Sequence, residues 1–186
     1  MSDSRIDGLN FGAAIAFIVP GLLAFKGLTY HSKTFNVWMI AAQSHDQSLG
    51  VFLFILLAAT ALGIGISGAR ALVIDSFFYS RLAFGWRVTR PAILWNRLDD
   101  EGQRTLAMII DGYYRYYQCY ANSLVGLAVF VVCRLALPKR GGWPASYWFA
   151  LAAVAFCLLW SSHDSFRKYT QALGNLFIQS EAKEGT

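Results

Sequence analysis

The sequence predicts an all-helical protein that crosses a membrane four times, and three observations support this prediction. Hydrophobic residues make up 56% of the 186 residues and charged residues only 15%, whereas about 25% of a soluble domain is charged. The mean hydropathy is +0.42. The apolar residues also form continuous runs, which are typical of membrane helices, whereas the strands of a membrane barrel alternate apolar and polar residues.

The four runs cover about residues 9–29, 49–74, 119–137 and 145–162. Each has the roughly 18–20 residues that a helix needs to cross about 30 Å of hydrocarbon. Helices are expected because lipid offers no hydrogen bonds to an open backbone. The first run is not expected to be a cleaved signal peptide, because Asp3 and Asp7 precede it and no clear cleavage site follows. We expect one membrane domain over residues 1–186.

The first run contains Pro20-Gly21. Proline removes one backbone hydrogen bond and crowds the preceding turn, so a kink is expected there. The kink serves either as a packing bend or as a gating hinge, and we favour the packing bend.

The second run contains a formal G-x-G-x-x-G match over residues 63–68. No strand precedes it, so dinucleotide binding is not expected. Small residues instead recur every four positions, a pattern that lets two helix backbones approach closely in lipid. They are Ala61, Gly65 and Ala69 in one register and Gly63 and Ser67 in the other. We expect a helix contact here, either within one chain or between chains.

The stretch 75–118 is amphipathic and separates the second run from the third. Its first part interleaves aromatic residues with arginines, which favours contact with anionic headgroups over direct nucleic-acid binding. Asp100 and Gln103 have the spacing of a capping box. From Arg104 to Leu137 the chain has no proline, so we expect one long helix that extends the third span into the cytoplasm.

Four polar residues, Asp111, Arg115, Gln118 and Asn122, are spaced so that they share one face of this long helix, and five tyrosines cluster where it enters the membrane. Upstream, Arg97 and Arg104 extend this stripe at seven-residue spacing if the helix is unbroken through Gly102. Polar groups that enter a membrane must meet water, a ligand or other polar groups. Two interpretations stay open: an interfacial anchor with an Asp111–Arg115 pair, or a stripe that lines an aqueous vestibule or a groove for a partner.

The tail, residues 164–186, has apolar residues at helical spacing. Three roles are open for it: it lies on the membrane, packs under the bundle, or docks a partner.

Charge predicts the orientation. Ten of the sixteen Lys and Arg residues fall in the N-terminus, the stretch 75–118 and the tail, whereas three fall in the opposite connections, namely Lys33, Lys139 and Arg140. Both termini are therefore expected in the cytoplasm, with the bacterial inner membrane as the natural location. The remaining three, Lys26, Arg70 and Arg134, are expected near helix ends with their charges reaching outward.

No catalytic residue, metal site or cofactor is expected. Cys119, Cys133 and Cys157 lack a C-x-x-C spacing and are expected to pack between helices. His45 and His163 each stand in a Ser-His-Asp triplet, but consecutive residues point in different directions and cannot form a triad.

We therefore expect a non-enzymatic membrane protein that forms a homo-oligomeric, channel-like or membrane-perturbing assembly, in contact with anionic lipids, with its Arg/Tyr region as sensor or docking site. In overall size and layout the chain resembles small four-helix membrane subunits of bacterial stress or anti-phage operons. That resemblance implies the alternative, an anchor or sensor subunit for a soluble cytoplasmic partner. A lipid-modifying membrane enzyme is the third hypothesis.

Overall fold

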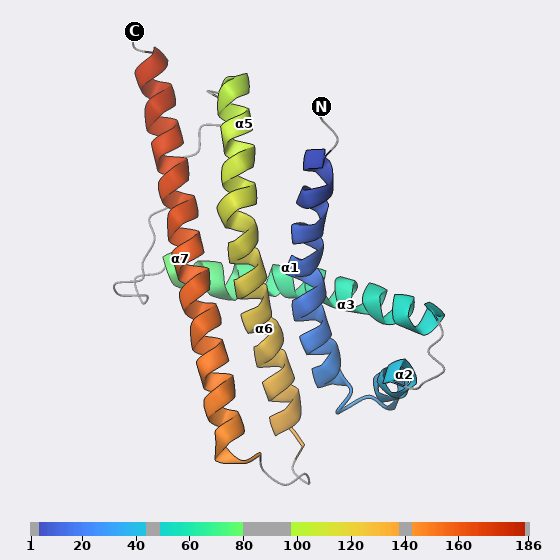
Figure 1. The fold of residues 1–186 in the computed structure, drawn as a ribbon. Coiled ribbons are helices and arrows are strands. Elements are labelled where there is room, and N and C mark those ends of the chain that lie inside the picture. The colour runs from blue at the N-terminus through green and yellow to red at the C-terminus, as the bar shows by residue number, and fades with distance from the viewer. Residues whose placement is uncertain (1–3, 44–48, 80–97, 138–142, 185–186) are drawn as a thin grey trace.

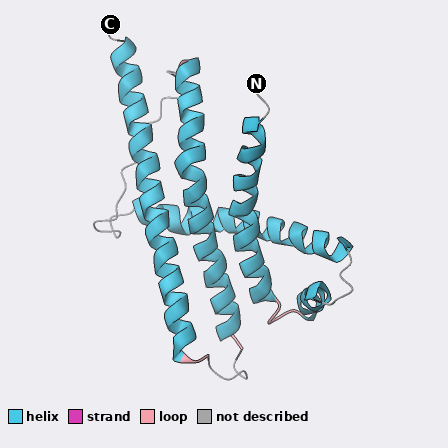
Figure 2. Cartoon of the chain, in the orientation of Figure 1, coloured by secondary structure: helices cyan, strands magenta, loops and turns pink. Residues whose placement is uncertain are grey.

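The structure is a computed structural model that describes residues 4–43, 49–79, 98–137 and 143–184. Helices account for 93% of these residues and no strand occurs among them (Figure 2). The predicted all-helical class is confirmed for this part of the chain. The elements are α1 Ser4–Leu28, α2 Lys33–Gln43, α3 Leu49–Arg70, the π-helical turn η1 Ala71–Asp75, α4 Ser76–Tyr79, α5 Asp100–Ile109, the π-helical turn η4 Ile110–Tyr114, α6 Arg115–Leu135 and α7 Ala145–Glu184.

Among the described residues, three continuous helices are long and apolar enough to cross a membrane. They run over Leu49–Phe78, Asp100–Leu135 and Ala145–Ile178. A fourth span is reached if Ala14–Leu28 and Lys33–Ala41, which meet at a bend of 120°, count as one. Length and composition of the described helices thus fit a multi-pass membrane protein.

The direction of α3 differs from the arrangement of four spans side by side that the sequence predicts. Figure 1 shows α1, α5–α6 and α7 as a row of upright helices, with α3 running across that row. Successive parts of α3 accordingly meet different helices: Ala59 lies against α1, and Phe78, beyond η1, stacks on Phe166 of α7 at 5.7 Å between ring centroids. Uniform hydrophobicity indicates that α3 avoids water, but it selects no packing direction.

The ends of the upright helices lie at two opposite ends of the bundle. The first turn of α1, the first turn of α5 and the last turn of α7 lie at one end (Figure 1). The turn between α1 and α2, the last turn of α6 and the first turn of α7 lie at the other. Long helices α5–α6 and α7 are therefore antiparallel.

Helix α1 is held between α3 and α6 by close contacts at glycines. A Cβ at Gly63 of α3 would overlap the backbone carbonyl of Phe17, and one at Gly126 of α6 would come within 2.5 Å of the backbone oxygen of Pro20. Such contacts are the means by which helices associate in lipid.

The Pro20-Gly21 pair lies at this crossing. Pro20 is buried and α1 continues through it to Leu28. A Cβ at Gly21 would overlap the backbone of Ala59 on α3. The structure thus places both residues in a packing contact.

The two long helices α5–α6 and α7 also pack together beyond the level of α3. Asp99 caps α5, since its carboxylate accepts a hydrogen bond of 2.7 Å from the backbone N–H of Gly102. The cap is therefore one residue before the predicted Asp100.

Of the three roles open for the tail, the structure has packing: the tail continues α7, and Leu173 and Phe177 join Leu106 of α5 in an apolar cluster.

Candidate functional site

A buried charged cluster lies where the end of α3 meets α6 and α7. Arg70 is only 3% exposed, and its Nη1 donates to Oδ1 of Asp75 at 3.2 Å. Tyr117, fully buried on α6, donates its hydroxyl to the same carboxylate oxygen. The hydroxyl of Tyr114 lies 3.5 Å from Nη2 of Arg70. We call these four residues the Arg70 cluster.

The local backbone explains why Arg70 and Asp75 meet. Residues five apart point in different directions on an α-helix, whose turn takes 3.6 residues. Between these two residues the chain forms η1, whose i→i+5 hydrogen bonds bring residues five apart onto one side. The second π-helical turn, η4, ends at Tyr114. Both turns therefore adjoin the Arg70 cluster, and π-helical turns are frequent at functional sites.

Aromatic rings enclose the cluster. The guanidinium carbon of Arg70 is 4.9 Å from the ring centroid of Tyr117 and 5.9 Å from that of Tyr114, within the range of cation–π attraction. The two tyrosine rings in turn pack on α7, Tyr117 at 4.5 Å from Phe166 and Tyr114 at 4.9 Å from Tyr169. The cluster therefore joins three helices around one cation.

The buried charge of Arg70 is only partly satisfied. Its Nε has no hydrogen-bond partner among the described residues, and its contact with Tyr114 is long for a hydrogen bond. The carboxylate side of the pair is more open, since the Asp75 side chain is 22% exposed. A buried ion pair of this kind contributes little net stability yet is costly to break.

Sequence reasoning did not identify this cluster. It placed Arg70 at a helix end with its charge reaching outward; the structure corrects this, because the helix continues to Tyr79 and the guanidinium is buried beside the rings of Tyr114 and Tyr117. The available signal was the pair of opposite charges, Arg70 and Asp75, in an otherwise apolar run.

The predicted polar stripe is only partly assembled. Arg97 lies outside the described residues. Arg104 is exposed on α5, and Nε of Arg115 lies 2.9 Å from Oδ1 of Asp111, with the two side chains 26% and 32% exposed. The structure therefore brings Asp111 and Arg115 together near the surface.

The lower members of the stripe turn inward. Gln118 is half-buried, and Asn122 is fully buried, where its Nδ2 donates to the backbone oxygen of Ala16 on α1 at 3.1 Å. The turn η4 interrupts the regular α-helix, so a spacing counted at 3.6 residues per turn loses its phase there. Arg104 and Asn122 consequently do not share an exposed face.

The small residues of α3 divide between a closed side and an open side. Gly63 is buried against α1, and Ser67 is half-buried. A Cβ at Gly65 would meet nothing within 4 Å. An apolar groove of about 500 Å³ lies on this open side, lined by Ala61, Leu62, Gly65, Ile66 and Ala69 of α3, Ala24 and Leu28 of α1, and Val125 and Val129 of α6.

In the described part of the chain, no set of three His, Cys, Asp or Glu side chains is arranged to hold a metal ion. Asp164 accepts a hydrogen bond of 2.7 Å from Lys168, and the His163 ring faces Phe78. Cys119, Cys133 and Cys157 are free thiols, and His45 lies outside the described residues.

Compared with family models, curated protein sequences and solved structures, the chain matches none of them. Function is therefore proposed from the geometry alone.

Proposed function

We propose that the chain is a non-enzymatic integral membrane protein that works as a homo-oligomeric, channel-like or membrane-perturbing assembly, with the Arg/Tyr region of α5 and α6 as its cytoplasmic sensing or docking site. The observation that supports this proposal best is the open groove beside Gly65.

The groove has the character of the contacts that already hold the chain together. Inside the chain, α1 approaches α3 and α6 at Gly63 and Gly126, where no side chain separates the backbones. Gly65 presents the same kind of surface, with nothing described within 4 Å of a Cβ placed on it. Since lipid provides no hydrophobic drive for association, close packing at small residues is what joins helices in a membrane. A helix of a second copy is the natural occupant.

The outer surface of α7 agrees with a lipid or helix environment. Only 6% of the most apolar stretch of α7 is buried within the chain. Phe149, Phe156 and Trp160 are exposed along this helix. Contiguous apolar surface of this extent is rare on soluble monomers.

The Arg70 cluster offers a way to couple assembly to the rest of the molecule. Gly65 and Arg70 are on one continuous helix, so a neighbour that docks on the groove acts on the same rigid element that carries the buried cation. The cluster joins this element to α6 and α7, and α5, which carries Arg104, continues directly into α6. A partner that docks on α5 and a helix that packs in the groove would therefore both contact one set of packed helices, α3, α5–α6 and α7.

The test is a pair of matched substitutions on α3. Gly65→Leu fills the groove, whereas Gly68→Leu adds the same side chain at a position that is equally open but does not line it. Gly65→Leu should reduce the particle mass in mild detergent to that of one chain and abolish ion flux in liposomes, and Gly68→Leu should match the parent protein in both measurements. A parent protein that is a single chain without flux would refute the proposal.

A membrane anchor or sensor subunit for a soluble partner, as in a bacterial stress or anti-phage defence operon, is the second candidate. It is favoured by the packed pair of α5 and the end of α7, which leaves Met108 and Ile178 exposed beside its apolar cluster. The test is co-purification with the product of a neighbouring gene: a complex that Met108→Glu abolishes, in a protein without flux, would establish this function instead.

A further inference from the structure

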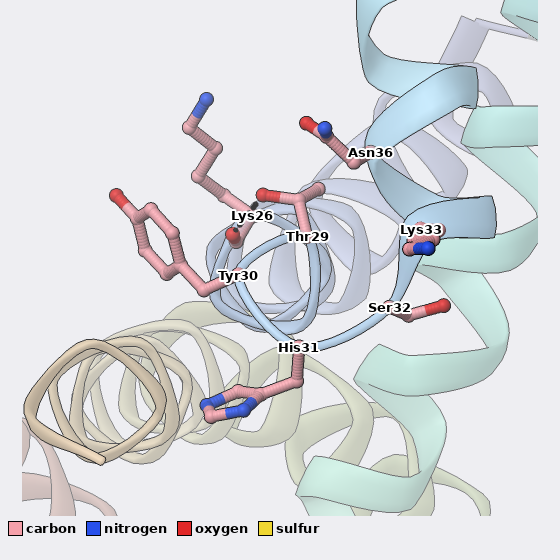
Figure 3. A pocket seen from close by; sticks show the side chains of 7 residues that line it. All are labelled: Lys26, Thr29, Tyr30, His31, Ser32, Lys33 and Asn36. Atoms are coloured by element: carbon pink, nitrogen blue, oxygen red, sulfur yellow. Dashed lines mark hydrogen bonds between the residues drawn. The ribbon is translucent and has the colours of Figure 1, made fainter. Parts of the chain in front are cut away.

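A polar hollow of about 390 Å³ lies at the turn between α1 and α2 (Figure 3). Two lysines and several hydrogen-bonding side chains line it. They are Lys26, Thr29, Tyr30, His31, Ser32, Lys33 and Asn36.

Several of these residues fix the shape of the turn. A ring nitrogen of His31 lies 2.6 Å from the backbone oxygen of Cys133, which ties the turn to the end of α6. Thr29 donates its hydroxyl to the backbone oxygen of Lys26 at 2.7 Å. The Tyr30 ring packs on Phe130, with 6.0 Å between centroids. The hollow is thus part of an ordered turn.

The two lysines bring positive charge to the hollow that the described residues do not neutralise. Neither Lys26 nor Lys33 forms an ion pair with them, and both are exposed. The guanidinium of Arg134 adds a third positive charge beside the turn, 5.8 Å from the Tyr30 ring. Figure 3 shows Lys26 and Asn36 projecting to the same side of the turn, while His31 points away from them.

The surroundings place the hollow at the depth of lipid headgroups. Trp143 stacks on Phe130, and Tyr147 and Trp148 lie next to Trp143. Such aromatic belts mark the boundary between hydrocarbon and water. Lys26 and Lys33 lie at the end of α1 and the start of α2, at this same end of the bundle.

We propose that this hollow binds the phosphate of an anionic phospholipid headgroup, with the ammonium of Lys26 and the amide of Asn36 on one side and the ammonium of Lys33 at the rim. Ammonium groups and an amide N–H are suitable donors for phosphate oxygens. The aromatic belt favours a lipid as the source of the phosphate. The hollow shares no lining residue with the groove on α3.

Native mass spectrometry of the full chain in mild detergent tests the proposal, with phosphatidylglycerol and phosphatidylcholine as probes. Each ammonium near a headgroup contributes a factor of about five in affinity. Lys26→Gln and Lys33→Gln should each weaken phosphatidylglycerol retention about fivefold, and the double variant about 25-fold, leaving phosphatidylcholine retention unchanged. Asn36→Asp replaces the amide by a negatively charged carboxylate of similar size, and it should also abolish the preference for the anionic lipid.

Lys168→Gln is the control, because it removes the same charge from an exposed lysine that already pairs with Asp164; it should retain lipid as the parent does. The lysine variants are at exposed positions, and an unchanged unfolding temperature shows that they fold. Equal retention of both lipids by the parent protein, or equal loss in Lys168→Gln, would overturn the proposal. Displacement of the lipid by inorganic phosphate at similar concentration would assign the hollow to a soluble phosphate instead.

Discussion

Two arginine–aspartate pairs, each with its aspartate on a π-helical turn, show how differently the same residue types behave in this protein. Across η1, Arg70 and Asp75 lie 3.2 Å apart with side-chain exposures of 4% and 22%. At η4, Arg115 and Asp111 lie 2.9 Å apart with exposures of 26% and 32%. The first pair is surrounded by the rings of α6 and α7, while the second faces outward.

Burial decides what each pair does. An exposed pair one helical turn apart contributes only about 0.3–0.5 kcal/mol, because water screens it and side-chain entropy opposes it. Breaking a buried pair leaves an uncompensated charge, at a cost of about 3–5 kcal/mol. The Arg70 cluster is therefore a place where helix packing and charge are coupled, whereas the Asp111–Arg115 pair contributes little to stability.

The strongest way to break this comparison is to remove one carboxylate charge at each pair. Asp75→Asn should lower the free energy of unfolding by about 3–5 kcal/mol, because Arg70 is then buried without a counter-charge. In a chain of this size that corresponds to a drop of roughly 10 °C in the unfolding temperature. Thermal unfolding in mild detergent, followed by size-exclusion chromatography, measures the change.

Asp111→Asn is the matched control, with an expected loss of at most about 0.5 kcal/mol. Equal shifts for the two variants would mean that burial does not distinguish the pairs.

The contrast also shows what sequence reasoning can and cannot reach. Apolar runs predict the helices, and the absence of proline predicts the long helix that the structure has from Asp100 to Leu135. The Arg70–Asp75 pair escapes such reasoning because a spacing of five is out of phase with a 3.6-residue turn, and only the π-helical turn brings it into phase.

The direction of α3 and the position of the cap on α5 could not be predicted either, each for a separate physical reason. The transverse direction of α3 depends on which of its small residues meet α1. Gly63 and Gly65 are the same residue type in the same apolar run, so the sequence does not indicate that Gly63 makes that contact and Gly65 does not. The cap at α5 is shifted by one residue because Asp99 and Asp100 are both good capping residues, so composition does not choose between them.

Removing one hydroxyl sharpens the comparison. Tyr117→Phe deletes the hydrogen bond to Asp75 while keeping the ring that packs on Phe166. Hydrogen bonds to charged groups contribute about 1.5–3 kcal/mol, so a loss in this range is expected in the same unfolding measurement. Tyr116→Phe, one position earlier and exposed, should be silent. A silent Tyr117→Phe would show that Arg70 alone satisfies the carboxylate.

Replacing both buried charges should cost less than replacing one. In the Tyr117→Phe background, where no buried hydroxyl loses its acceptor, the double variant Arg70→Met with Asp75→Leu removes both charges and fills their space with apolar atoms. Stability within about 1 kcal/mol of that background is therefore expected. If the cluster couples the groove to α6 and α7, this stable variant should nevertheless lose ion flux in liposomes. A double variant as unstable as Asp75→Asn would show that the packing of the α6 rings depends on the charges.

The smallest effect on stability, and the most informative one for function, is expected at the exposed pair. Arg115→Ala should change the free energy of unfolding by no more than about 0.5 kcal/mol, and should leave expression and particle mass intact. If the guanidinium meets a phosphate, a partner carboxylate or water in a vestibule, the same variant should lose activity or partner binding. Gln118→Ala, one turn further on, should then act alike, while Tyr116→Phe should be tolerated. Full activity of Arg115→Ala, or a loss that accompanies failed assembly, would make the Asp111–Arg115 pair an interfacial anchor.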